Sequence, residues 1–144
     1  MQELTRITMT VQELSQYANL LERLARSEEI LENLQNASRP GVSVIDGMPH
    51  STEIKNKMEY IVIEIEDLIE RIKYLKREIA KEKKRLNSYF DKIVDERIRM
   101  ALRLKYVQNL TWKETADMLG DRYTEEGLKK LCYKYIKSDI HNQS

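Results

Sequence analysis

The sequence has little of the residues that interrupt or cross-link a chain. It holds one cysteine, two prolines and four glycines in 144 residues. A single cysteine, Cys132, excludes a disulfide within the chain and fits a reducing compartment. Few glycines and prolines, together with 34% charged and 41% hydrophobic residues, are typical of a charged helical protein rather than a sheet protein or a disordered chain. The sequence therefore predicts an all-α fold.

The sequence also lacks the patterns that mark secretion, membrane insertion, metal binding or catalysis. Residues 1–6 lack the apolar stretch of a signal peptide, and no apolar run is long enough to span a bilayer. His50 and His141 are isolated, Cys132 has no second cysteine beside it, and no glycine-rich phosphate loop occurs. We expect a cytoplasmic protein that is not an enzyme, with no catalytic residues, metal, cofactor or membrane partner.

The charge is distributed unevenly along the chain. The whole sequence carries a formal net charge of +1, but residues 97–137 hold 10 Lys and Arg against 5 Asp and Glu. This segment therefore carries +5 and the rest of the chain −4. Such asymmetry is expected where one end of a protein contacts phosphate, although helix surfaces are often locally basic.

Two helical segments and a connector are predicted in the N-terminal part. Apolar residues spaced three to four apart predict an amphipathic helix over about residues 10–36. They are Leu14, Tyr17, Leu21, Leu24 and Leu31. Residues 37–51 contain both prolines and two of the four glycines, which indicates a connector. Because this connector includes Val42, Val44 and Ile45, we expect it to lie across a helical surface rather than wholly in solvent.

A second helix, starting near Thr52, carries the longest apolar pattern. Apolar residues follow a heptad spacing over about five repeats, with β-branched residues favoured at position a. This heptad seam consists of Met58, Ile61, Ile65, Leu68, Ile72, Leu75, Ile79 and Leu86. Val62, Ile69 and Phe90 widen it, and a wide apolar stripe implies more than one neighbouring helix. We expect an antiparallel hairpin with residues 10–36 and a homodimer through the seam; a hairpin in a monomer stays open.

A basic cluster follows on the same helix, from Lys81 to Arg85. It could form a patch that contacts the DNA backbone. The alternative is a solvated helix face supported by pairs such as Glu78 with Lys81, although Glu78 and Glu82 repel each other.

The C-terminal segment contains the signals of three further helices. Residues 91–109 form the first, and Asn87-Ser88 could mark a bend before it. Thr111 and Glu114 have the spacing of a capping box, and Ala116 is small enough for a close helix crossing. Gly120 supplies a left-handed cap, and Thr124 is the next N-cap. Two helix starts and one stop within about fifteen residues are the pattern of a helix-turn-helix, whose second helix, here 124–137, enters the major groove.

One face of this second helix and the turn before it are expected to contact DNA. Leu128 faces the core, as do Trp112 and Cys132, the cysteine as a packed small residue. Glu126 either accepts a hydrogen bond from a cytosine amine or stabilises the helix start. The expected DNA-binding residues, in which lysines neutralise phosphates and the tyrosine hydrogen-bonds one, are Lys113, Arg122, Thr124, Glu126, Lys129, Lys130, Tyr133, Lys134 and Lys137.

Residues 104–120 resemble the start of sigma-70 region 4 helix-turn-helix modules. The likeness is closest to phage and prophage regulators of the ArpU and RinA type, which also join a helical hairpin to a connector like Gly47-Met48-Pro49. The resemblance implies a region-4-like fold and a role in late gene transcription. Residues 121–123 make a longer turn than the sigma pattern has, and Glu126 and Gly127 stand where the family often has a basic or polar residue and a threonine. The resemblance therefore supports the fold more than the base readout.

Together these patterns predict two domains and a function. Residues 1–90 form the helical hairpin or coiled coil with its connector at 37–51, and residues 91–144 form the helix-turn-helix domain. We expect a sequence-specific DNA-binding regulator of phage or prophage transcription, with double-stranded DNA as partner and host RNA polymerase as a candidate partner. Two alternatives stay open: a small terminase subunit for DNA packaging, and a coiled-coil adaptor whose helix-turn-helix binds protein.

Overall fold

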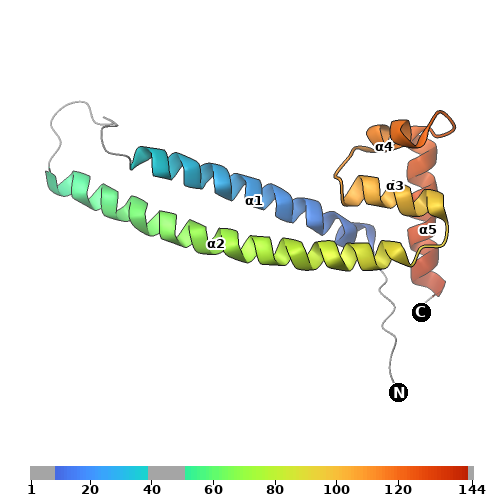
Figure 1. Ribbon diagram of the computed structural model, residues 1–144, viewed down its shortest axis with the longest axis horizontal. Helices are drawn as coiled ribbons and strands as arrows, with labels where there is room; N and C mark the ends of the chain where they lie inside the picture. Colours follow the sequence, from blue (N-terminus) through green and yellow to red (C-terminus); the bar gives the residue numbers. More distant parts are fainter. Residues whose placement is uncertain (1–8, 39–50, 143–144) are drawn as a thin grey trace, which may run out of the picture. The chain divides into compact units, whose positions relative to one another are not determined.

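Every regular element in the computed structural model, which describes residues 9–38 and 51–142, is a helix (Figure 1). The five helices are α1 Val11–Ala37, α2 Ser51–Asp91, α3 Glu96–Tyr106, α4 Trp112–Leu119 and α5 Glu125–Asn142. Within these described ranges there is no strand, so the expected all-α class is confirmed. Residues 39–50, most of the predicted connector, lie outside the described residues.

The helix ends agree with the sequence except around α3 and at the end of α5. Asn87 and Ser88 belong to α2. The break between α2 and α3 lies after the end of α2, ahead of the N-cap residue Asp95. The Asp95 carboxylate accepts a hydrogen bond from the backbone N–H of Arg97 at 2.9 Å and so caps α3. The predicted helix 91–109 is accordingly shorter at both ends, and α5 runs beyond the predicted Lys137.

The chain divides into two compact units. The first comprises Met1–Asn19 with Ile79–Ser144, and the second comprises Leu20–Glu78. The division passes through both long helices, because each contributes one end to each unit. These units differ from the two domains expected from the sequence, which were divided at residue 90. That domain division stays a prediction.

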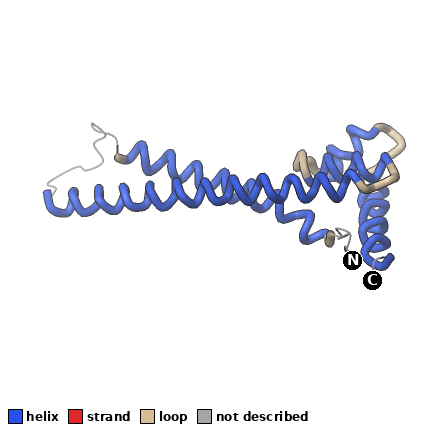
Figure 2. Tube along the Cα trace, turned by 60° about the horizontal axis from the view of Figure 1, so that its bottom comes forward, coloured by secondary structure: helices blue, strands red, loops and turns tan. Residues whose placement is uncertain are grey.

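In the second unit, segments of α1 and α2 lie side by side (Figures 1 and 2). Ile72 and Leu75 of α2 and Ser27 of α1 are buried there, and Lys76 approaches Glu28 at 4.0 Å.

The predicted heptad seam is thus partly an internal packing face. Ile72, Leu75 and Leu86 are buried within the single chain, and Met58 is exposed. The remaining members, Ile61, Ile65, Leu68 and Ile79, are half-buried. Whether the seam also joins two chains stays a prediction.

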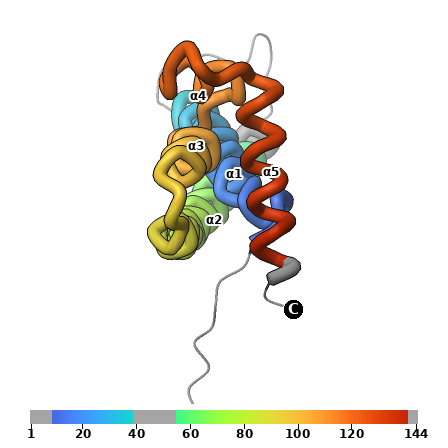
Figure 3. Tube along the Cα trace, turned by 90° about the vertical axis from the view of Figure 1, so that its right-hand side faces the viewer, coloured from blue at the N-terminus to red at the C-terminus, as the bar shows by residue number. Residues whose placement is uncertain are grey.

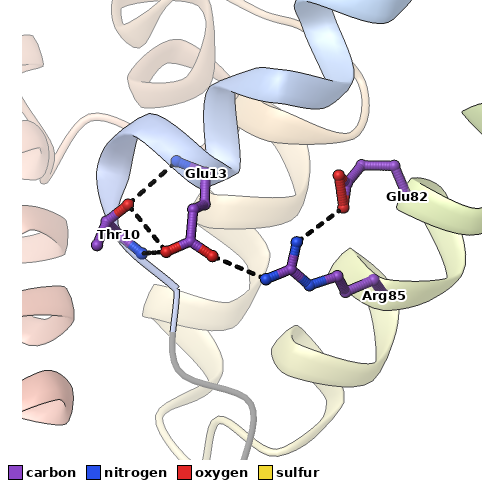
Figure 4. A network of polar contacts seen from close by, with 4 residues as sticks. All are labelled: Thr10, Glu13, Glu82 and Arg85. Atoms are coloured by element: carbon purple, nitrogen blue, oxygen red, sulfur yellow. Dashed lines mark hydrogen bonds and ion pairs between the residues drawn. The ribbon is translucent and has the colours of Figure 1, made fainter.

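In the first unit, the start of α1 is capped. The Thr10 hydroxyl accepts a hydrogen bond from the Glu13 N–H at 3.2 Å, and the Glu13 carboxylate lies 3.5 Å from the Thr10 N–H (Figure 4). The same carboxylate pairs with Arg85 of α2 at 2.7 Å, and Arg85 also pairs with Glu82 at 3.2 Å. Arg85, part of the predicted basic cluster, is therefore engaged in holding α1 to α2.

The core of the first unit joins its helices through large apolar side chains. The fully buried ones include Leu14, Leu86, Phe90, Ile93, Leu102, Leu128 and Ile136. Within this unit α3, α4 and α5 each contact the other two and form a bundle, called here the α3–α5 bundle (Figure 3). It carries nearly all the residues expected to contact DNA.

Candidate nucleic-acid interface

The start of α4 has the capping box expected from the sequence. The Glu114 N–H donates to the Thr111 hydroxyl at 3.0 Å, and the Thr111 N–H donates to the Glu114 carboxylate at 2.9 Å. The buried Thr115 hydroxyl donates a hydrogen bond to the Thr111 carbonyl at 2.8 Å, so this hydroxyl has a partner despite its burial. These bonds fix the direction in which α4 leaves α3.

The turn after α4 depends on Gly120, but in a different conformation from the one expected. Its φ of 114° is positive, whereas its ψ of 173° lies outside the left-handed helical region. That combination is essentially restricted to glycine. The predicted left-handed cap is therefore wrong in detail, although the requirement for glycine holds.

Trp112 joins the three helices of the bundle. Its ring meets Tyr106 of α3 edge-on at 6.2 Å between centroids and Tyr133 of α5 at 5.9 Å. Lys105 lies 5.7 Å from the centre of the Trp112 ring, a favourable cation–π distance. Trp112 and Ala116 are both buried, which confirms the expected core roles of these two residues.

One face of α5 packs into the core. Leu128, Cys132 and Ile136 recur every four residues and are all buried. Burial raises the pKa of the Cys132 thiol to about 12, so this group stays protonated and weakly reactive at neutral pH. Its expected role as a packed residue is confirmed.

The other face of α5 is lined by lysines. An open hollow of about 550 Å³ lies along it. The residues that line the hollow are Glu126, Lys129, Lys130, Tyr133, Lys134, Lys137 and Ser138. Six of the nine expected DNA-binding residues are thus brought together on one surface, called here the lysine face.

The remaining three expected residues do not line this hollow. Lys113 near the start of α4, Arg122 in the turn and Thr124 at the start of α5 are all exposed. Ser138 belongs to the lysine face but was not expected from the sequence. The signal for it was available, because Ser138 follows Lys134 by one helical turn.

Three arginines among residues 97–137 are paired with groups of the same chain. Arg97 pairs with Asp95 at 2.9 Å, Arg99 donates to the Ile93 carbonyl at 2.8 Å, and Arg103 pairs with Asp91. By contrast, within residues 9–38 and 51–142 no ion pair holds Lys130, Lys134 or Lys137. The charge available to an anionic ligand is therefore concentrated on α5.

The start of α5 shows why residue 127 is glycine. The Thr124 hydroxyl accepts a hydrogen bond from the Gly127 N–H at 3.0 Å, as expected for an N-cap. A Cβ added at Gly127 would lie 2.9 Å from that hydroxyl oxygen, which is too close. Gly127 therefore makes room for the cap, a constraint that the sequence did not reveal.

We expect Gly127→Ala to leave the free energy of unfolding nearly unchanged in the natural sequence. The gain in helix propensity, up to about 1 kcal/mol, is offset by loss of the Thr124 cap, which costs about 1 kcal/mol. In a Thr124→Ala background the same change should stabilise the chain by up to about 1 kcal/mol. Urea denaturation of the natural chain, the two single variants and the double variant measures these free energies of unfolding. Equal effects of Gly127→Ala in both backgrounds would show that the two residues are not coupled.

The caps of α3 and α4 also predict a pH dependence. Hydrogen bonds from Arg97 hold the pKa of Asp95 below its ordinary value, and hydrogen bonds from Thr111 do the same for Glu114. Because both folded pKa values are depressed, their stabilisation is full above the ordinary pKa values, about 4, and is lost as the pH falls through the folded values.

We expect the melting temperature to fall less between pH 5 and about pH 3 in the double variant Asp95→Asn, Glu114→Gln than in the natural sequence. Both replacements keep the capping geometry but do not titrate. Thermal denaturation followed by circular dichroism across this range is the measurement. Parallel pH profiles for the two proteins would contradict the assigned role of these carboxylates.

Comparisons with protein-family models, curated proteins and solved structures found no match to this chain. Among the described residues, no helix combines the length and apolarity needed to cross a membrane. Over the same residues, no cluster of three or more potential metal-ligating side chains occurs. A function can therefore be inferred only from the geometry of the α3–α5 bundle.

Proposed function

We propose that the α3–α5 bundle is a helix-turn-helix that binds double-stranded DNA with α5 in the major groove. The observation that carries the proposal is the lysine face, where Lys129, Lys130, Lys134 and Lys137 gather on a single helix whose opposite face is buried. A surface of this kind neutralises phosphates on both sides of a groove.

The dimensions of α5 suit this role. Its 18 residues give a length of about 27 Å, and the major groove, about 12 Å wide, admits one helix. Glu126, Lys130, Tyr133 and Lys137 recur at intervals of four, three and four residues and so form one stripe along the helix. Lys129 lies 5.7 Å from the centre of the Tyr133 ring, which orients both side chains on this surface.

The acidic start of α5 supplies selectivity rather than affinity. Glu125 and Glu126 are exposed in its first turn, where the helix dipole favours a negative charge. In the major groove, the Glu126 carboxylate accepts a hydrogen bond from a cytosine amine and is repelled by base edges that present only acceptors. The lysines in the following turns provide the attraction to phosphate.

We further propose that the whole chain is a regulator of phage or prophage transcription. The support is the resemblance of residues 104–120 to sigma-70 region 4 modules, now joined by a bundle in which Thr111, Ala116 and Gly120 have structural roles. In this proposal α1 and α2 form a helical hairpin that acts as the scaffold. Host RNA polymerase is then a candidate partner.

A footprint of the full chain on DNA from its own genomic neighbourhood tests this function. We expect a protected site at low micromolar protein, with binding that weakens steeply as salt is raised. Host RNA polymerase retained by the protein without any affinity for DNA would instead support the adaptor alternative. No salt-sensitive DNA binding at such concentrations would refute the proposal.

A further inference from the structure

An open groove lies between segments of α1 and α2 in the unit that comprises Leu20–Glu78. Its volume is about 820 Å³. The apolar part of its lining comes from Ile30 and Leu34 of α1 and from Leu68 and Tyr74 of α2. Ile30 is 49% and Tyr74 50% exposed, and the two leucines are half-buried. This groove, called here the α1–α2 groove, therefore leaves apolar surface open to a ligand.

The α1–α2 groove has the dimensions of a helix-binding site. On α1 its lining extends from Arg23 to Leu34, a span of about 17 Å or three helical turns. On α2 the lining residues recur every three or four positions between Glu64 and Tyr74, so they share one face of that helix. A groove of this kind accepts a third helix whose apolar residues also recur every three or four positions.

The helix segments that border the groove are acidic. Residues 27–38 contain three acidic and no basic side chains, and residues 58–70 contain five acidic and no basic side chains. All of them are exposed, namely Glu28, Glu29, Glu32, Glu59, Glu64, Glu66, Asp67 and Glu70. Arg23 and Arg71 also line the groove but lie outside these two segments. The complementary ligand therefore combines an apolar stripe with flanking positive charge.

We propose that the α1–α2 groove binds a basic amphipathic helix of a protein partner. The apolar residues of that helix pack on Ile30 and Leu68, and its lysines or arginines face Glu64 and Asp67. Neither carboxylate forms an ion pair with any other residue of the described ranges, so both are available to the partner. This interaction does not depend on DNA binding by α5.

Other segments of this chain match the groove less well than a separate protein does. Residues 39–50 carry one basic and one acidic side chain, which gives no net positive charge to set against the acidic border. Helix α5 is rich in lysine, but its apolar residues Leu128, Cys132 and Ile136 are buried. A second copy would therefore present lysines to the groove without an apolar stripe.

A labelled synthetic peptide added to the full chain tests the proposal. The probe is a helix of about 18 residues, long enough to cover the groove, with leucines spaced three and four apart and lysines beside them. We expect fluorescence anisotropy to give a dissociation constant of about 50 µM or below. A scrambled peptide of the same composition, which has the charge without the apolar stripe, should bind at least about tenfold more weakly. Equal binding of the two peptides, or no binding at about 100 µM, would overturn the proposal.

Two serine variants show whether the peptide occupies this groove. Ile30→Ser should weaken binding by about fivefold or more, because it removes apolar surface from the lining. Ile63→Ser is the matched control, since Ile63 is 53% exposed but does not line the groove, and it should leave the dissociation constant unchanged. Melting curves followed by circular dichroism verify that both variants are folded. Equal effects of the two changes on peptide binding would contradict the proposed site.

A pair of charge variants tests the acidic border in the same way. Glu64→Gln with Asp67→Asn should weaken the leucine–lysine peptide by about tenfold at low salt, because it removes the two carboxylates that the lysines face. Glu29→Gln with Glu66→Gln removes as much charge from exposed positions that do not line the groove, and it should change binding by less than about threefold. Equal losses in both double variants, or no loss in either, would overturn the assignment of this groove to a basic helix.

Discussion

Replacing Trp112 by alanine should lower the free energy of unfolding by about 3–5 kcal/mol, the largest stability change expected for a single residue here. The side chain is only 8% exposed and meets Tyr106 and Tyr133 edge-on, so its removal leaves a cavity where α3, α4 and α5 converge. Aromatic pairs of this geometry add to the loss of buried area. The change should also release Lys105 from its position over the ring.

Two matched variants give this prediction its control. Trp112→Phe keeps an aromatic ring and should cost less than Trp112→Ala. Met118→Ala removes a large side chain from the same helix, but Met118 is 70% exposed, so the change should stay within about 0.5 kcal/mol. Urea denaturation followed by circular dichroism is suitable, because Trp112 is the only tryptophan. If Trp112→Ala lowered the free energy of unfolding no more than Met118→Ala, Trp112 would not be the residue that joins the three helices.

Removing three lysines from α5 should have the largest effect on DNA binding. For Lys130, Lys134 and Lys137 all changed to alanine, we expect the slope of log K against log salt to become shallower by about 2.7, and affinity at 0.1 M salt to fall by about 10²–10³-fold. The physical reason is that each lost phosphate contact leaves its counterions on the DNA. Fluorescence anisotropy on a labelled duplex at several salt concentrations measures both quantities.

The triple variant Lys81, Lys83 and Lys84 to alanine removes the same charge from α2. These residues are exposed, and we expect their loss to leave the slope nearly unchanged. Equal reductions for both triple variants would mean that binding follows net charge rather than the lysine face. A reduction for the α2 variant alone would move the interface to the basic cluster that begins at Lys81.

The sequence predicted best the features that are decided within a few residues. The Thr111 and Glu114 capping box is local hydrogen bonding, and its spacing alone identifies it. The break before α3 was missed because no glycine or proline marks it and only the Asp95 cap does. Gly127 was likewise read as a departure from a family pattern, since its contact with Thr124 is visible only in three dimensions.

The candidate site was predicted only in part, because helical periodicity is local in the sequence and the pairing of charges is not. Periodicity places Lys130, Tyr133 and Lys137 on one side of a helix, and the structure brings them to one surface. Counting charges could not show that Arg97 and Arg103 form ion pairs with Asp95 and Asp91 of the same chain. A heptad pattern identifies a packing face but not its neighbour, so it could not separate packing within the chain from packing between chains.

Competition by groove-specific ligands tests most directly whether α5 enters the major groove. With the full chain bound to duplex DNA, methyl green occupies the major groove and netropsin the minor groove. We predict that methyl green displaces the protein at concentrations where netropsin has little effect, because only the major groove admits a helix. Displacement by netropsin with resistance to methyl green would contradict the account.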